Sequence, residues 1–126
     1  MKRIIETSNA PQAVGPYSQA VEINGMLFVS GQVPLNPSTM KLVEGDIKEQ
    51  TQQVMENIGA ILKAAGYDYS DVVKSTCLLS DIENFKPMNE VYAKFYTDKK
   101  PARAAFAVKD LPLGALVEIE TIAVKS

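Results

Sequence analysis

An arginine and two glutamates near the C-terminus are the residues of this sequence best suited to chemistry. Arg103 lies in the apolar segment 101–108, and Glu118 and Glu120 lie in the apolar segment 117–124. Both segments are predicted to be strands that face each other, and the two glutamates share one side of theirs because side chains alternate along a strand. A guanidinium binds a carboxylate in two-point contact, and a neighbouring carboxylate can act as a general base. The pattern predicts a small site for a carboxylate-bearing molecule and leaves open which glutamate is the base.

Four further residues have side chains or backbone groups that suit a small polar pocket. Ser30 and Gly31 end a predicted strand, where glycine lets a ligand approach the backbone closely. The chain has no histidine to activate Ser30, so hydrogen bonding is its predicted role. Tyr17 offers a ring with a hydroxyl group, and Asn89 falls at the edge of an apolar helix stripe. A turn, ordinary packing or a polar helix boundary would explain each of these residues equally well.

Composition limits the kind of protein and the kind of chemistry. The chain has 126 residues, 46% of them hydrophobic, which is enough for a single domain over residues 1–126 with an ordinary core. A net charge of −2 gives nucleic-acid binding little support. With no histidine and one cysteine, Cys77, a zinc site or a histidine-based triad is nearly excluded, and no metal or cofactor is expected.

The sequence predicts a cytoplasmic protein that makes no membrane contact. The first residues reach Glu6 too early for a signal peptide, and no apolar run approaches the roughly 20 residues that span a membrane. A lone cysteine cannot form an internal disulfide, which fits a reducing compartment. Cys77 stands among apolar and β-branched residues and is expected to be an inert core thiol.

The first half of the chain is predicted to form a strand, a hairpin and a helix. A short strand covers 3–6, and Asn24-Gly25 between apolar runs favours a hairpin over 21–29. A loop over 34–45 is long enough to indicate function or mobility. Asp46 opens a helix with Glu49 placed as in a capping box. Gly66 is a good stop for that helix.

The second half is predicted to add three strands and a second helix. A strand covers 71–79, a helix covers 85–96, and two closing strands lie around 103–108 and 116–124. Right-handed crossovers place both helices on one face of the sheet. The other face would then be left uncovered in a sheet that contains Leu27, Val29, Phe106 and Val117. A monomer rarely exposes so large an apolar area, so a closed homo-oligomer with pockets between subunits is expected.

Several segments together resemble the signature segments of the RidA/YjgF family of reactive-intermediate deaminases. The resemblance runs essentially from end to end, and it is the combination that is specific. The segments are Gly15-Pro16-Tyr17-Ser18-Gln19-Ala20, Ser30-Gly31-Gln32-Val33-Pro34, Asn84-Phe85 with Asn89 and Tyr92, Pro101-Ala102-Arg103, and Val117-Glu118-Ile119-Glu120-Thr121-Ile122-Ala123-Val124.

The resemblance implies a fold, an assembly and a reaction. The implied fold is a chorismate-mutase-like α+β domain with a mixed six-stranded sheet and two helices on one face. The implied assembly is a homotrimer with clefts between subunits. The implied reaction is the hydrolysis of 2-imino acids and their enamine tautomers, such as 2-iminobutanoate and 2-aminoacrylate, to 2-oxo acids and ammonia.

The resemblance also implies roles for single residues. Arg103 would hold the substrate carboxylate, and Glu118 rather than Glu120 would be the acid near the attacking water. The residues that would line the cleft are Tyr17, Ser30, Gly31 and Asn89. Many members of the family have cysteine at the position of Ala105, which is also expected to touch the substrate, so substrate fit and thiol-based regulation are expected to differ here.

A second hypothesis comes from a different class of protein. The same fold could serve a non-catalytic module that binds a small carboxylate or regulates a partner. The acidic chain without histidine makes a ribonuclease a distant third. Faster formation of 2-oxo acid from an enzymatically generated imine would distinguish the deaminase from the binding module.

Overall fold

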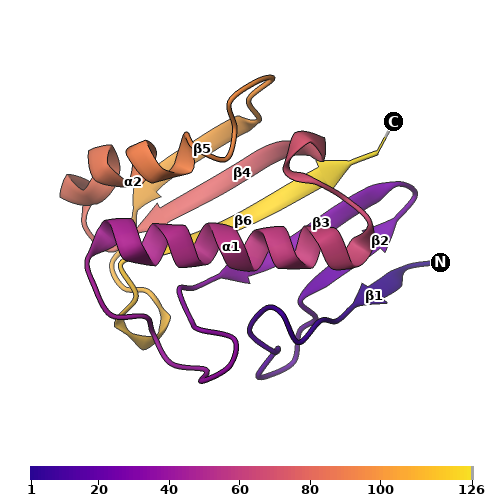
Figure 1. Ribbon diagram of the computed structural model, residues 1–126, viewed down its shortest axis with the longest axis horizontal. Helices are drawn as coiled ribbons and strands as arrows, with labels where there is room; N and C mark the ends of the chain where they lie inside the picture. Colours follow the sequence, from indigo (N-terminus) through magenta and orange to yellow (C-terminus); the bar gives the residue numbers. More distant parts are fainter. Residues whose placement is uncertain (126) are drawn as a thin grey trace.

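The computed structural model, which describes residues 1–125, is a six-stranded sheet with two helices packed on one face (Figure 1). The strands lie in the order β1-β2-β3-β6-β4-β5. The pair β4–β5 is parallel, and the other pairs are antiparallel. The single-domain α+β fold with a mixed sheet is thus confirmed. The elements are β1 (Arg3–Ile5), β2 (Ala20–Ile23), β3 (Met26–Gln32), α1 (Ile47–Ala65), β4 (Val72–Leu79), α2 (Phe85–Tyr92), β5 (Ala102–Ala107) and β6 (Val117–Val124).

Local signals in the sequence account for the hairpin and for α1. Asn24 and Gly25 have φ angles of 52° and 75°, as a two-residue turn of type I′ between β2 and β3 requires. Asp46 caps α1, and the backbone N–H of Asp46 donates to Glu49 Oε1 at 2.8 Å, which completes the predicted capping box. Gly66 ends α1 in the left-handed conformation, with φ 85°.

The second helix is shorter than predicted and ends at Tyr92 rather than at Tyr96. The backbone N–H groups of Lys94 and Phe95 donate to carbonyl groups three residues back, so the helix tightens and stops. This tightening leaves Tyr96 in the core, where its ring lies 4.9 Å from that of Tyr92. The apolar stripe therefore continues past the end of α2, which is why the periodicity predicted too long a helix.

The closing strands β5 and β6 do not face each other as the sequence predicted, because β4 lies between them. On β4, Ser75 pairs with Arg103 of β5 on one side and with Thr121 of β6 on the other. Leu78 likewise pairs with Phe106 and with Glu118. The strands β5 and β6, which follow each other along the chain, are thus not neighbours in the sheet.

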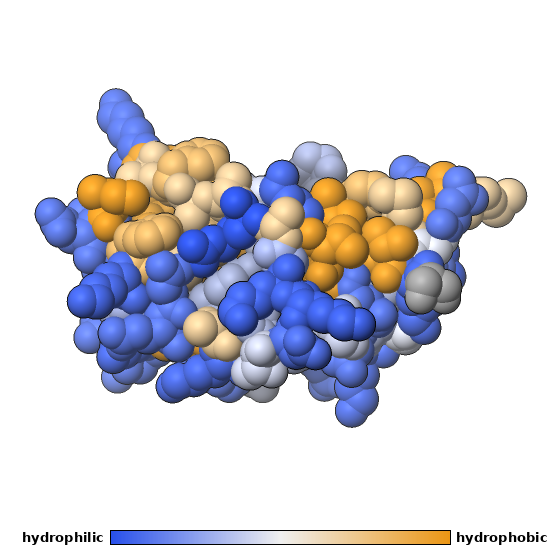
Figure 2. All heavy atoms as spheres, turned by 90° about the horizontal axis from the view of Figure 1, so that it is seen from above, coloured by the Kyte–Doolittle hydropathy of each residue, from blue (hydrophilic) through white to orange (hydrophobic). Residues whose placement is uncertain are grey.

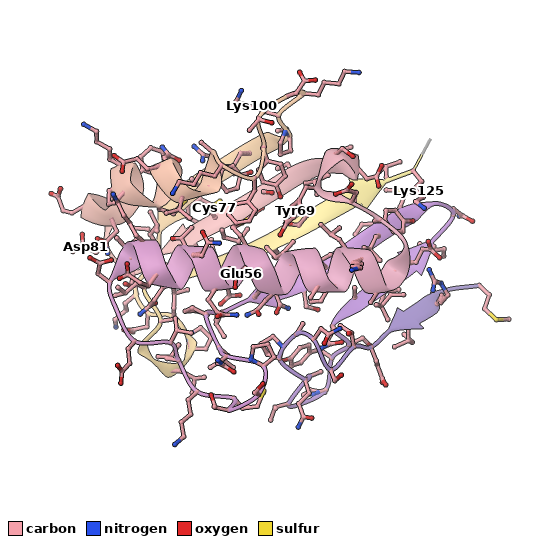
Figure 3. The ribbon with its side chains drawn as sticks, viewed as in Figure 1. Glu56, Tyr69, Cys77, Asp81, Lys100 and Lys125 are labelled. Carbon is pink, nitrogen blue, oxygen red and sulfur yellow. The ribbon has the colours of Figure 1, made fainter. Side chains whose placement is uncertain are left out.

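The hydrophobic core lies between the sheet and the two helices. The apolar stripe of α1 lies fully inside it and consists of Ile47, Val54, Met55, Ile58, Ile61, Leu62 and Ala65. Cys77 of β4 is buried beneath the helices (Figure 3), and burial raises the pKa of its thiol to about 11. The thiol is therefore inert at neutral pH, as expected. No helix over residues 1–125 is both long and apolar enough to cross a membrane.

The sheet face opposite the helices carries exposed apolar side chains. Leu27, Val29 and Val117 are not among them. Side chains alternate between the two faces of a strand, and these three residues lie on the face that the helices cover. The exposed set includes Ile23, Met26, Phe28, Val73 and Phe106, with 36% to 49% of each residue accessible. Figure 2 shows hydrophobic residues gathered along one long side of the molecule. The open face fits the predicted homo-oligomer, which stays a prediction.

Candidate functional site

Four of the predicted site residues meet in one cavity. Tyr17, Ser30, Gly31 and Glu118 line a space of about 800 Å³ at the ends of β3 and β6. Gly31 lies where the β3–β6 register shifts, between Val29 and Gln32. Such a bulge turns backbone groups at a strand end toward a site.

Ser30 presents its hydroxyl oxygen to the cavity as a hydrogen-bond acceptor. Its Oγ donates to the carbonyl oxygen of Ser18 at 2.6 Å, so the single hydroxyl proton is already engaged. The lone pairs of Oγ remain for an N–H donor of a ligand. This supports the predicted hydrogen-bonding role and not a nucleophilic one.

Gln19 is a supporting residue that the sequence did not reveal. Its side chain is buried, and its Nε2 donates to the carbonyl oxygen of Pro11 at 2.8 Å. Its Oε1 accepts from the backbone N–H of Thr7 at 2.7 Å. These bonds fix the irregular segment that carries one wall of the cavity, including Tyr17. A lone glutamine beside a strand carries no periodicity that would have marked it.

Glu118 is held against Gly31, and its environment favours a proton. A Cβ added at Gly31 would overlap Glu118 Oε2 and lie 3.0 Å from Cδ, so the carboxylate rests directly on the glycine backbone. Burial raises the pKa of Glu118, and repulsion from the Glu120 carboxylate raises this pKa further. Glu120 also lines the cavity but is exposed. A carboxyl group with a raised pKa is a suitable general base near neutral pH.

Arg103 lies outside this cavity, in a second cluster that α2 provides. Its Nη1 donates to Asn89 Oδ1 at 2.6 Å. The guanidinium carbon lies 5.1 Å from the Tyr92 ring centre and 5.4 Å from the Phe85 ring centre, within range of cation–π attraction. Two rings and one amide therefore hold the guanidinium in a single orientation.

The charge of Arg103 has no carboxylate partner within residues 1–125. The ion pairs there are Arg3 with Glu22 and Lys48 with Glu90. A hollow of about 390 Å³ opens beside the guanidinium, and Lys100 from the preceding loop adds a second positive charge to its wall (Figure 3). The cluster suits a carboxylate ligand.

Arg103 and Glu118 lie on opposite faces of the sheet, which corrects the predicted side-by-side arrangement. Arg103 is in register with Ser75, which is buried on the helix side, whereas Glu118 is in register with Leu78 on the open side. Ala105 shares the helix side with Arg103 and packs against the core. Within one chain the seven predicted site residues thus form two separate groups.

Nothing in the described part of the chain is arranged like a metal centre. Residues 1–125 hold no group of three or more histidine, cysteine, aspartate or glutamate side chains close enough to share an ion.

Comparison with known proteins gives a consistent relationship over the whole chain. Residues 7–125 match the protein family described as Endoribonuclease L-PSP. A RutC family protein of Pyrococcus horikoshii is 54% identical over 125 residues, covering 99% of each chain. The mouse 2-iminobutanoate/2-iminopropanoate deaminase is 48% identical over 99% of this chain and 93% of its own length. The crystal structure of a putative endoribonuclease of Thermotoga maritima superposes with a TM-score of 0.98 at 50% identity, covering 100% of this chain and 99% of the other.

The fold and the two polar clusters define a small α+β protein with a cavity at the ends of β3 and β6 and a separate arginine cluster on the helix side of the sheet. The chain belongs to the RidA/YjgF family, as its motifs indicated, and several of its relatives are named as deaminases of reactive imines.

Proposed function

We propose that this protein hydrolyses 2-imino acids, and the enamines that interconvert with them, to 2-oxo acids and ammonia. The observation that carries the proposal is Glu118, a partly buried carboxylate with a raised pKa beside Ser30 and Gly31 in one cavity. Relatives named for this reaction, at 46% to 49% identity, support it. The protonated imine and one water give the 2-oxo acid and one ammonium ion, so no oxidant or reductant is needed.

Each polar group has a defined part in the reaction. Arg103 binds the substrate carboxylate, which removes rotational freedom before the reaction begins. Ser30 Oγ accepts a hydrogen bond from the imine nitrogen. Glu118 takes a proton from the attacking water and returns it to the departing amine. A protonated imine is already electrophilic, so neither a metal nor a covalent nucleophile is required.

We propose further that the protein is a homotrimer and that two copies complete each site. Arg103 and Glu118 lie on opposite faces within one chain, so they act on one small substrate only if different copies supply them. The exposed apolar side chains of the open face, such as Phe28 and Phe106, offer the surface for such contacts. Sedimentation should show one species at three times 13.7 kDa.

The first test is catalysis. A pyridoxal-phosphate dehydratase or an amino acid oxidase generates the imine in solution, and ammonia and 2-oxo acid are measured against spontaneous hydrolysis. The wild-type protein should accelerate both signals, and Glu118→Gln should slow turnover about 10²–10⁴-fold because an amide cannot accept the water proton. Glu120→Gln should have a milder effect. No acceleration, together with binding of 2-oxo acids, would identify a non-catalytic carboxylate-binding module instead.

The second test asks whether copies share a site. Arg103→Ala and Glu118→Gln chains are unfolded together, mixed and refolded. If different copies supply the two residues, about a quarter of the sites in randomly mixed assemblies recover both. A site within one chain would recover no activity on mixing.

RNA cleavage, which the family description names, has little support in this chain. The net charge is −2 and the sequence contains no histidine, so neither an electrostatic footprint for RNA nor a histidine acid–base pair is present.

A further inference from the structure

Two residues that line the Glu118 cavity have an unusual backbone conformation. Met40 and Leu113 have φ angles of 59° and 60°, in the left-handed region. A residue with a Cβ occupies this region at a cost in free energy, whereas glycine occupies it readily. Met40 and Leu113 come from loops far apart in the sequence. Two apolar residues held in this conformation at one cavity indicate a function for their side chains.

The cavity has a polar end and an apolar end. Ser30, Gly31 and Glu118 form the polar end described above. Met40 and Leu113 belong to an apolar wall that is completed by Val14, Leu35 and Pro112. Leu113 and Val14 are 67% and 70% exposed, so this wall loses much contact with water when an apolar group lies on it.

The substrate side chain is the part of the molecule that an apolar wall can recognise. The cavity of about 800 Å³ belongs to one chain, and in the proposed assembly it also receives Arg103 of another copy, so the apolar wall and not the volume indicates the ligand. The carboxylate and the imine are the same in every 2-imino acid, and the polar groups bind these. The side chain is the variable part, and it is attached to the imine carbon that water attacks.

We infer that Met40 and Leu113 form a subsite for the substrate side chain. This chain therefore prefers 2-imino acids with a long apolar side chain, such as the imine of leucine, over 2-iminopropanoate. The inference rests on the proposed deaminase function and names the substrate class within it. The strained backbone is retained because the apolar side chains provide the contact.

The test compares two imines and four proteins. Enzymatically generated imines of leucine and of alanine are given to the wild type, Leu113→Gly, Met40→Gly and Asn24→Gly. Asn24 is the matched control, because its φ of 52° lies in the hairpin turn, away from the cavity lining. Glycine readily adopts the left-handed conformation at all three positions, so each variant should remain folded, as its melting curve would show.

Leu113→Gly and Met40→Gly should each lower kcat/KM for the leucine imine about tenfold, while kcat/KM for 2-iminopropanoate stays within about twofold. Asn24→Gly should leave both values unchanged. A wild type that prefers 2-iminopropanoate, or a preference that neither cavity variant alters, overturns the inference. Dissociation of the assembly in Leu113→Gly also overturns it, because the wall would then be a subunit contact.

Calorimetry separates this inference from the proposed reaction. The probes are 4-methyl-2-oxopentanoate and pyruvate, the products of the two imines. Tighter binding of the larger acid, lost in Leu113→Gly, supports the subsite even if neither imine is hydrolysed faster. If neither product binds and neither imine is hydrolysed, both the subsite and the proposed function are refuted.

Discussion

Gly31→Ala should inactivate the protein through Glu118 while leaving it folded. The added methyl group would overlap Glu118 Oε2 and lie 3.0 Å from Cδ and 3.3 Å from Cγ. The φ of Gly31 is not in the left-handed region, so alanine fits the backbone. The carboxylate is the far end of a flexible side chain, so it moves aside rather than forcing the strand apart.

The contacts set different magnitudes for stability and for catalysis. Rotating one side chain away from its preferred angle costs about 0.5–1.5 kcal/mol, so the melting temperature should fall only slightly. Loss of a positioned general base slows turnover about 10²–10⁴-fold, or about 3–5 kcal/mol of activation free energy. The activation free energy of the reaction should thus change several times more than the free energy of unfolding.

A double-mutant cycle shows whether the methyl group acts through Glu118. Turnover is measured for the wild type, Gly31→Ala, Glu118→Gln and the double variant. If Gly31→Ala acts by displacing the carboxylate, it should cost less than about twofold once Glu118 is already an amide. A full additional loss in the double variant would mean that the methyl group blocks the substrate, and would refute the reasoning.

Gly59→Ala is the matched control for this cycle. A Cβ at Gly59 would overlap the hydroxyl oxygen of Tyr69, which donates to the carbonyl oxygen of Met55. This steric overlap is of the same kind as that at Gly31, but it lies on α1, outside the cavity lining. Stability should change, and turnover should not.

Three further predictions address charge and positioning. Glu118→Gln should raise the melting temperature at pH 7. The pKa of Glu118 is raised in the folded protein, so the stability that this group contributes is present below its ordinary pKa of 4.5 and is lost as pH rises through the folded value. The increase in melting temperature should therefore vanish in acid. Tyr92→Leu should raise KM about fivefold with little change in kcat, because it removes a cation–π contact of about 1 kcal/mol with Arg103. Tyr92→Phe keeps the ring and removes only a buried hydroxyl group without a hydrogen-bond partner, so KM should be unchanged. Arg103→Lys should keep the assembly, as sedimentation would show, but weaken calorimetric binding of 2-oxo acids by about tenfold, because the planar two-point contact is lost. Equal KM values for Tyr92→Leu and the wild type, or unchanged affinity in Arg103→Lys, would contradict these roles.

The features that were predicted correctly from the sequence are those that a few adjacent residues determine. The turn at Asn24-Gly25, the capping box of Asp46 and the stop at Gly66 each depend on the conformational preferences of a few adjacent residues. All three are present in the structure. The length of α2 was overestimated because Tyr96 continues the apolar stripe after the helix has ended.

The face on which Arg103 lies could not be predicted from its strand. In β6, buried Val117, Ile119 and Thr121 alternate with Glu118 and Glu120, so the two sides differ clearly. In β5, alanines stand on both sides of the strand, and nothing in the sequence distinguishes them. The insertion of β4 between these strands depends on long-range pairing that no local pattern encodes.

The arrival of Arg103 from another copy in the proposed assembly bears on the pKa of Glu118. A free guanidinium beside Glu118 would lower the pKa of this carboxyl group and make it a weaker base. In the proposed assembly, Arg103 reaches the cavity from another copy and is neutralised by the carboxylate of the substrate it binds. Burial and Glu120 then remain the dominant influences on Glu118, and both raise its pKa. Substrate binding would thus anchor the imine and preserve the strength of the base that activates water.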